Sequence, residues 1–167
     1  RNYQKFVSNY LRKNPGDIID IETGSKVGEH TGLMNYTIGQ RKGLGIGGTD
    51  QTTDAWFVVG KDLKTNTLYV EPGFEHPYAY SDSAIITEVK WRGEKRSGKF
   101  TAKFRYRQED QDINVTWIDD TTIRVDYPQG IRAVTPGQVC AIYDGQECIG
   151  SGFISEAFYK GERRLYS

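Results

Sequence analysis

The second half of the chain is a succession of short segments in which apolar and polar residues alternate. Turn residues separate these segments at short, even intervals, and no helical pattern lies between them. Alternation with a period of two is typical of strands that turn one face towards a core. The pattern predicts a small antiparallel barrel or sandwich, and we expect a six-stranded antiparallel β-barrel at residues 77–158. Its strands are expected at Ala84 to Trp91, Lys99 to Arg105, Asp112 to Ile118, Thr122 to Tyr127, Gln138 to Tyr143 and Glu147 to Ile154.

The first 76 residues predict a smaller, β-rich central domain. Apolar residues recur at helical spacing from Tyr3 to Leu11 and indicate a short N-terminal helix. Four strand patterns follow, and the first two are expected to form a hairpin. They are Asp17 to Glu22, Lys26 to His30, Ala55 to Lys61 and Thr67 to Glu71. The fold class is therefore mainly β, and the polar tail at 159–167 is expected to fray.

The total charge gives no sign of a nucleic-acid partner. The chain has 22 Lys and Arg residues and 22 Asp and Glu residues, so its formal net charge is zero. A local basic face remains compatible with that total, because the field of one surface steers a polyanion. The aromatic content of 13% suits strands and also suits surfaces that stack on bases. Composition does not separate these two interpretations.

The two cysteines are expected to be small buried hydrophobic residues. Cys140 and Cys148 lie in apolar strand patterns without a C-x-x-C spacing, which favours free thiols in a reducing cytosol over a disulfide or a metal site. His30 and His76 are too distant in sequence to suggest metal ligands by themselves. No apolar run has the length of a membrane span and no signal peptide opens the chain, so we expect a cytoplasmic protein without a membrane partner. Because the sequence begins at Arg1 rather than Met, it is expected to be a piece of a longer protein.

Five glycines fall between Gly39 and Gly48 and predict a shaped loop rather than a helix or a central strand. The adjacent cations Arg41 and Lys42 lie near its start. Exposed backbone amides and two cations suit an anionic ligand, and phosphate is the obvious candidate. The alternative is a tight β connection with a solvated Arg-Lys pair. The loop matches neither of the glycine patterns that mark nucleotide-binding sites.

No complete catalytic constellation is present, since the chain lacks a nucleophile elbow, a metal-binding His pair and a Walker loop. The stronger feature is Arg105-Tyr106-Arg107-Gln108. Alternation in a strand would put Arg105 and Arg107 on one face and Tyr106 on the other. Guanidinium groups bind phosphates, a tyrosine stacks on a base and an amide reads a base edge, so this motif favours RNA. The alternative is an edge strand whose charges prevent aggregation.

Several motifs, in matching order and spacing, resemble the tRNA-specific 2-thiouridylase family. The resemblance covers nearly the whole chain, and the opening Arg1 to Phe6 looks like the segment through which that family enters its central domain. The motifs are Gly32 to Gly45, Trp56 to Asp62, Phe104 to Gln108, Arg132 to Gln138 and Tyr143 to Gly145.

The resemblance implies an enzyme that adenylates O2 of the wobble uridine in certain tRNAs and replaces it with sulfur from a cysteine persulfide. An N-terminal ATP-pyrophosphatase domain upstream of Arg1 would hold the ATP-binding motif, both catalytic cysteines, ATP and Mg²⁺. This chain would then be the central domain and the C-terminal barrel, with no catalytic residue and no cofactor of its own, and inactive alone. Its partner would be tRNA, and a sulfur-carrier protein or a cysteine desulfurase relay would act through the full-length enzyme.

The same resemblance implies which residues contact tRNA, namely Arg105, Tyr106 and Gln138. We add three candidate contacts to tRNA or to phosphate from the motifs above, which are Arg41, Lys42 and Arg107. No metal site is expected. Two alternatives remain, a stand-alone non-catalytic RNA-binding module and a structural or protein-interaction barrel. An intact enzyme that uses Cys140 or Cys148 is disfavoured, because neither has a neighbouring base or anion site in the sequence.

Overall fold

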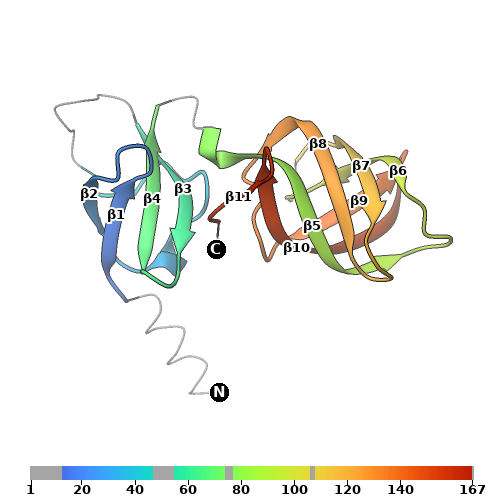
Figure 1. The fold of residues 1–167 in the computed structure, drawn as a ribbon, viewed down its shortest axis with the longest axis horizontal. Coiled ribbons are helices and arrows are strands. Elements are labelled where there is room, and N and C mark those ends of the chain that lie inside the picture. The colour runs from blue at the N-terminus through green and yellow to red at the C-terminus, as the bar shows by residue number, and fades with distance from the viewer. Residues whose placement is uncertain (1–12, 47–54, 74–76, 106–107, 167) are drawn as a thin grey trace, which may run out of the picture. The chain divides into compact units, whose positions relative to one another are not determined.

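The chain forms two compact units in the computed structural model (Figure 1). The structure describes residues 13–46, 55–73, 77–105 and 108–166. The first unit comprises Arg1–Ala79 together with Leu165–Ser167, and the second unit comprises Tyr80–Arg164. Each unit has its own sheet.

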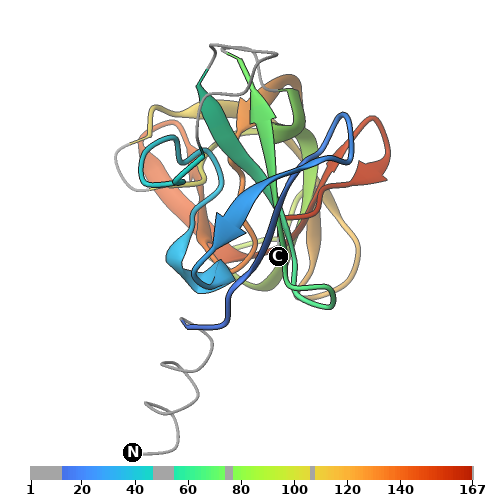
Figure 2. The same cartoon turned by 90° about the vertical axis from the view of Figure 1, so that its left-hand side faces the viewer.

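The first unit is built on a four-stranded sheet in the order β2-β1-β4-β3. β1 and β2 form the expected hairpin, β3 and β4 form a second antiparallel pair, and β1 runs parallel to β4 where the two hairpins meet (Figure 2). Two short 3-10 helices, η1 and η2, complete the described part of the unit. The helix expected at Tyr3 to Leu11 lies outside the described residues. The element bounds are β1 (Gly16–Asp20), β2 (Lys26–His30), η1 (Leu33–Asn35), β3 (Trp56–Asp62), β4 (Thr67–Pro72) and η2 (Pro77–Ala79).

The outer edge of β3 is covered by two other segments of the first unit. The N–H of Gly39 donates to the carbonyl oxygen of Val58 at 2.7 Å, and the N–H of Val58 donates to the carbonyl oxygen of Gln40 at 2.9 Å. Further along β3, the N–H of Lys61 donates to the carbonyl oxygen of Leu165. An uncovered edge strand is a template for pairing with other chains, so these contacts remove that liability over part of β3.

The second unit is a closed six-stranded antiparallel barrel, which confirms the predicted architecture. Its strands follow the order β10-β5-β8-β7-β6-β9, and the pairing of β9 with β10 closes the ring. The short strand β11 pairs with the last residues of β10. All seven pairings are antiparallel. The bounds are β5 (Tyr80–Trp91), β6 (Gly98–Lys103), β7 (Gln111–Trp117), β8 (Ile123–Arg132), β9 (Val139–Asp144), β10 (Glu147–Tyr159) and β11 (Glu162–Arg163).

The barrel closes because its longest strands bend. The β10–β5 pairing shifts register twice, between Ser151 and Phe153 and between Ile154 and Glu156. Such irregularities bend a strand and increase its twist, so a long strand can pair with different neighbours along its length. β10 therefore pairs with β9 near its start and with β5 over most of its length.

Inward-facing side chains of the barrel fill its interior. Tyr127 and Phe104 are fully buried, with ring centroids 5.2 Å apart. The hydroxyl of Tyr127 shares a hydrogen bond of 2.7 Å with the hydroxyl of Ser81, which is also fully buried. The one polar atom of this large side chain is therefore satisfied within the core.

The chain after the barrel differs from the expected fraying tail. β11 pairs with the end of β10, and Lys160 and Gly161 make the turn between them with positive φ angles of 50° and 83°. Tyr166 is only 2% exposed, and its hydroxyl donates to the carbonyl oxygen of Tyr78 at 2.9 Å within the first unit. The polar composition of the tail was misleading because backbone pairing and one buried aromatic residue hold it.

Candidate nucleic-acid interface

Arg105 lies beyond the end of β6, although the sequence pattern predicts that it lies within the strand. β6 ends at Lys103, which pairs with Ala141 on β9. The chain then turns, and the N–H of Gln108 donates to the carbonyl oxygen of Arg105 at 3.2 Å. The strand stops because β7, its other neighbour, begins at Gln111 and offers no partner beyond that point. Strand alternation therefore does not assign faces to this motif, and Tyr106 and Arg107 lie outside the described residues.

The turn after β6 is held by side chains as well as by the backbone. Phe104 is fully buried, and its N–H donates to the side-chain oxygen of Gln108 at 2.8 Å. Arg105 is exposed, and its Nη2 donates to the carbonyl oxygen of Arg132 at 3.3 Å. The buried aromatic ring and the glutamine side chain anchor the turn, so the guanidinium of Arg105 projects from a fixed point.

Gln138 immediately precedes β9 and is fixed against β10. Its carbonyl oxygen accepts a hydrogen bond of 2.9 Å from the N–H of Ile154, and the N–H of Gly137 donates to the carbonyl oxygen of Ile154 at 2.8 Å. The side chain of Gln138 is half-buried, and its Oε1 atom accepts no hydrogen bond from any described residue. The Oε1 atom is itself buried from solvent, so the half-exposed part of this side chain is the rest of the amide and its stem.

The strand register brings Arg105 and Gln138 to the same end of the barrel. Lys103, the last residue of β6, lies opposite Ala141, the third residue of β9. Arg105 follows β6 by two residues and Gln138 precedes β9 by one, so both lie past the last paired positions on the same side. The hydrogen bond from Arg105 to Arg132, the final residue of β8, ties the two connections together. An arginine and an amide that are distant in sequence thus share one surface.

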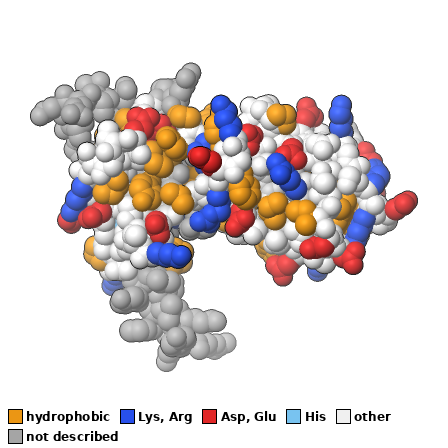
Figure 3. All heavy atoms as spheres, viewed as in Figure 1, with side chains coloured by type: hydrophobic (Ala, Val, Ile, Leu, Met, Phe, Trp, Pro, Cys, Tyr) orange, Lys and Arg blue, Asp and Glu red, His pale blue; other side chains and the backbone are white. Residues whose placement is uncertain are grey.

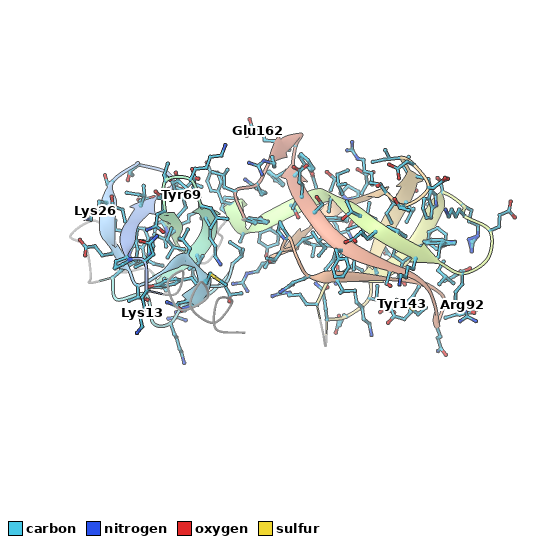
Figure 4. All side chains as sticks on the ribbon, turned by 90° about the horizontal axis from the view of Figure 1, so that it is seen from below. Lys13, Lys26, Tyr69, Arg92, Tyr143 and Glu162 are labelled. Carbon is cyan, nitrogen blue, oxygen red and sulfur yellow. The ribbon has the colours of Figure 1, made fainter. Side chains whose placement is uncertain are left out.

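A second cation, Lys103, precedes Arg105 by two residues and points out of the barrel. Residues Ala102 and Phe104 on either side of Lys103 are fully buried, so the Lys103 side chain points outward. Its Nζ atom lies 3.6 Å from a carboxylate oxygen of Asp110 and 5.5 Å from the ring centroid of Tyr143, which is labelled in Figure 4. The sequence motif did not include this lysine, although alternation with the apolar residues around it is the signal that identifies it.

The glycine-rich loop of the first unit is shaped by glycines and by one glutamine, up to residue 46 where its described part ends. Gly39, Gly43 and Gly45 have φ angles of 90°, 78° and 66°, which non-glycine residues rarely adopt. The side chain of Gln40 accepts from the N–H of Thr37 at 3.0 Å and donates to the carbonyl oxygen of Lys42 at 2.9 Å. The loop is therefore a fixed turn rather than a strand.

Arg41 and Lys42 project from this loop as exposed cations. Ile38 and Leu44 on either side of them are buried, with 3% and 5% of their surfaces exposed. Neither cation forms an ion pair or a side-chain hydrogen bond with another described residue. Arg41 and Lys42 belong to the first unit, whereas Arg105 and Gln138 belong to the second, so they form two separate candidate surfaces.

Charges of both signs are mixed on the one face of the molecule that Figure 3 shows, where Lys and Arg side chains are interspersed with Asp and Glu side chains. Near the barrel end, Asp110 pairs with Lys103, which lowers the local positive charge. A polyanion would therefore be bound through a few fixed contacts rather than by a broad basic field.

The two cysteines have different surroundings. Cys140 is fully buried, and burial raises the pKa of its thiol to about 12. Cys148 is exposed, which corrects the expectation that both are buried, because it lies next to the hairpin at the start of β10. Both are free thiols.

No cluster of three or more His, Cys, Asp or Glu side chains suited to a metal ion occurs among the described residues. His30 is buried and fully occupied: its Nδ1 accepts from the N–H of Gly32 at 3.0 Å, and its Nε2 lies 2.8 Å from the carbonyl oxygen of Asn66. His76 lies outside the described residues. No helix within the described ranges is long and apolar enough to cross a membrane.

Comparison with known protein families gives two matches that follow the two units. Residues 4–72 match the model described as the tRNA methyl transferase PRC-barrel domain. Residues 81–154 match the model described as the aminomethyltransferase beta-barrel domain. The chain is thus a tandem of two β-barrel-type modules, the first matching a model described from tRNA methyl transferases and the second one described from aminomethyltransferases.

Among curated relatives, the tRNA-specific 2-thiouridylase MnmA of Acholeplasma laidlawii is 70% identical over the whole chain. The proteins of the same name from Aster yellows witches'-broom phytoplasma and Bacillus cytotoxicus are 52% and 49% identical over 100% and 99% of the chain. The chain spans 44% of the length of each of these relatives. It belongs to the tRNA-specific 2-thiouridylase family and corresponds to the central and C-terminal β portion of such a protein.

Proposed function

We propose that this chain is the tRNA-binding part of a tRNA 2-thiouridylase. The full-length enzyme would make 2-thiouridine at the wobble uridine, by ATP-dependent adenylation followed by sulfur transfer from a cysteine persulfide. The chain would grip and orient the tRNA while a catalytic domain outside it performs the chemistry. The observation that carries this proposal is the shared position of Arg105 and Gln138 at one end of the barrel.

The chemistry of that barrel end suits a tRNA backbone with exposed bases. An arginine fork donates paired hydrogen bonds to phosphate oxygens, and a side-chain amide bonds to a base edge or to a 2′-hydroxyl group. Tyr106, between Arg105 and Gln108 in sequence, would add a stacking surface, and Arg107 a further phosphate contact. Arg41 and Lys42 on the first unit would contribute a second, sequence-independent phosphate contact.

The remaining partners follow from the family. ATP and Mg²⁺ would bind in the catalytic domain, and a sulfur-carrier protein or a cysteine desulfurase relay would deliver sulfur to that domain. Free thiols at Cys140 and Cys148 fit a reducing compartment, which supports a cytoplasmic enzyme. The chain alone is expected to be inactive in thiolation.

The test is binding of this chain to an unmodified tRNA with a wobble uridine, followed by fluorescence anisotropy across a salt series, with duplex RNA as competitor. We expect salt-sensitive binding that prefers tRNA. Arg105→Ala should weaken it and lower the slope of log affinity against log salt by about one, the value for one phosphate contact.

Arg92→Ala is the matched control for this test. Arg92 is also exposed, but it follows β5 and lies at the opposite end of the barrel, where its guanidinium lies 3.5 Å from a carboxylate oxygen of the exposed Glu147. Arg92→Ala should leave both the affinity and the salt slope unchanged. Equal effects of the two substitutions, or no binding by the unmodified chain at low salt, would overturn the proposed tRNA grip.

A further inference from the structure

Two exposed apolar side chains face each other across the β9–β10 pairing. Phe153 on β10 lies directly opposite Val139 on β9, and they are 45% and 51% exposed. Their neighbours in sequence, Gly152, Ile154 and Cys140, are buried, so Phe153 and Val139 both point out of the barrel. Directly opposed side chains in an antiparallel pair are close enough to form one continuous surface.

This apolar pair adjoins the barrel end that carries Arg105 and Gln138. Val139 follows Gln138 in the chain, and the N–H of Ile154, next to Phe153, donates to the carbonyl oxygen of Gln138 at 2.9 Å. On the other side of β9, the outward-pointing Lys103 lies opposite Ala141. The apolar pair therefore lies at the barrel end that carries Arg105, with the cation Lys103 on the neighbouring strand.

The size and the setting of the pair fit a nucleobase better than a protein. Two side chains are far smaller than the surface of about 800 Å² that each partner buries in a stable protein interface. A single aromatic ring next to an aliphatic side chain offers the area on which one base stacks. An aromatic ring with cations nearby suits an unpaired nucleotide, since the ring stacks on the base and the cations contact the phosphates.

We propose that Phe153, supported by Val139, is a stacking platform for one unpaired nucleobase of the bound tRNA. The inference rests on the proposed function, since it names a further contact on the same surface. Arg105 and Lys103 would hold phosphates next to the nucleotide stacked on Phe153. The platform contributes affinity without charge.

Phe153→Ala tests the platform in the same anisotropy assay. Loss of base stacking should weaken tRNA binding by about fivefold or more. The slope of log affinity against log salt should stay unchanged, because no phosphate contact is removed. Phe153→Tyr, which keeps the ring, should bind within about twofold of the unmodified chain. These two signatures together separate stacking from the electrostatic contribution of Arg105.

Ile118→Ala is the matched control. Ile118 is 56% exposed in the connection between β7 and β8, at the end of the barrel opposite Arg105, and its truncation should not change tRNA affinity. Thermal unfolding of all three variants checks that the barrel remains folded.

If Phe153→Ala binds tRNA as tightly as Ile118→Ala does, Phe153 is not a stacking platform. The proposed tRNA-binding function would stand in that case, and Phe153 would have another role, such as contact with a protein surface. An equal loss of tRNA affinity in Phe153→Ala and Phe153→Tyr would show that the aromatic ring does not stack on a base. Absence of tRNA binding by the unmodified chain overturns the proposed function, and the platform with it.

Discussion

Arg105 and Arg132 are joined by a hydrogen bond of 3.3 Å from the guanidinium of the first to the backbone carbonyl oxygen of the second. One arginine follows β6 and the other ends β8, so the bond links two connections that are 27 residues apart in sequence. One guanidinium nitrogen is thereby used within the barrel, and the other two form no hydrogen bond or ion pair with a described residue. A lysine at position 105 would keep the charge, but it would lack the planar fork that can bind the carbonyl oxygen of Arg132 and an anion at the same time.

Arg105→Lys should therefore keep the salt dependence of tRNA binding while lowering the affinity. The lysine retains one positive charge near phosphate, so the salt slope should match that of the unmodified chain. Loss of the bidentate geometry should cost roughly 1 kcal/mol, or about fivefold in affinity. Anisotropy titrations at three salt concentrations measure both quantities. Full affinity in Arg105→Lys would show that only charge matters at this position.

Arg41→Ala combined with Lys42→Ala should weaken tRNA binding without changing stability. Both side chains are exposed and have no ion-pair partner among the described residues, so their removal should change the free energy of unfolding by less than about 0.5 kcal/mol. If both contact phosphates, the salt slope should fall by about two. An unchanged affinity would assign this loop a structural role alone, as a cover for the edge of β3.

His30→Ala should destabilise the first unit. His30 is 1% exposed and bridges the backbone at Gly32 and Asn66 through its two ring nitrogens. Its removal leaves a cavity and two unpaired backbone groups, at a cost of about 2–4 kcal/mol. Hydrogen exchange of the β1 and β4 amides measures the loss. Glu29→Ala is the control, because its exposed pairing with Lys26 should contribute less than about 1 kcal/mol.

Gly152→Ala should destabilise the barrel by overpacking. A Cβ atom at this position would lie 2.7 Å from the carbonyl oxygen of Thr87 and 2.7 Å from a methyl carbon of Ile86. The backbone oxygen cannot move aside easily, so we expect a loss of about 1–3 kcal/mol in the free energy of unfolding. Thermal unfolding of this variant should show a lower midpoint, whereas Ser151→Ala on the outer face should melt with the unmodified chain.

The two cysteines should differ in reactivity. At pH 8 an aromatic disulfide reagent should modify the exposed Cys148 rapidly and leave Cys140 protected until the barrel unfolds. The pKa of Cys140 is about 12 in the folded state against an ordinary value of 9.0, so the unfolded state loses its proton first as the pH rises. Stability from this group is complete below pH 9 and falls between pH 9 and about 12. Two fast thiols in the native protein at pH 8 would contradict this assignment.

The strands were predictable because their signals are local. Alternating apolar residues and turns such as Asp144-Gly145 lie within a few residues of each other, and this turn forms the β9–β10 hairpin with Asp144 opposite Glu147. The end of β6 was not predictable from such signals. Whether Arg105 belongs to a strand depends on where β7 and β9 begin, which the three-dimensional pairing decides.

The candidate site was predictable only in part. The family resemblance implied Arg105 and Gln138, but no sequence spacing indicates that residues 33 positions apart share one end of the barrel. The sequence pattern around Phe153 predicts only a strand, because it does not tell which face of that strand the barrel turns inward. The role of His30 depends on Asn66, which lies 36 residues further along the chain.

The contacts of Leu165 and Tyr166 with the first unit set the order in which this protein can finish folding. About 100 residues separate Lys61 from these contacts, so a ribosome adding about 5–20 residues per second needs roughly 5–20 s to supply them. During that interval part of β3 is uncovered, while the whole barrel is synthesised and free to close. The unit that begins first is thus completed last, and the uncovered edge of β3 is the surface that a chaperone acting on the nascent chain would need to protect.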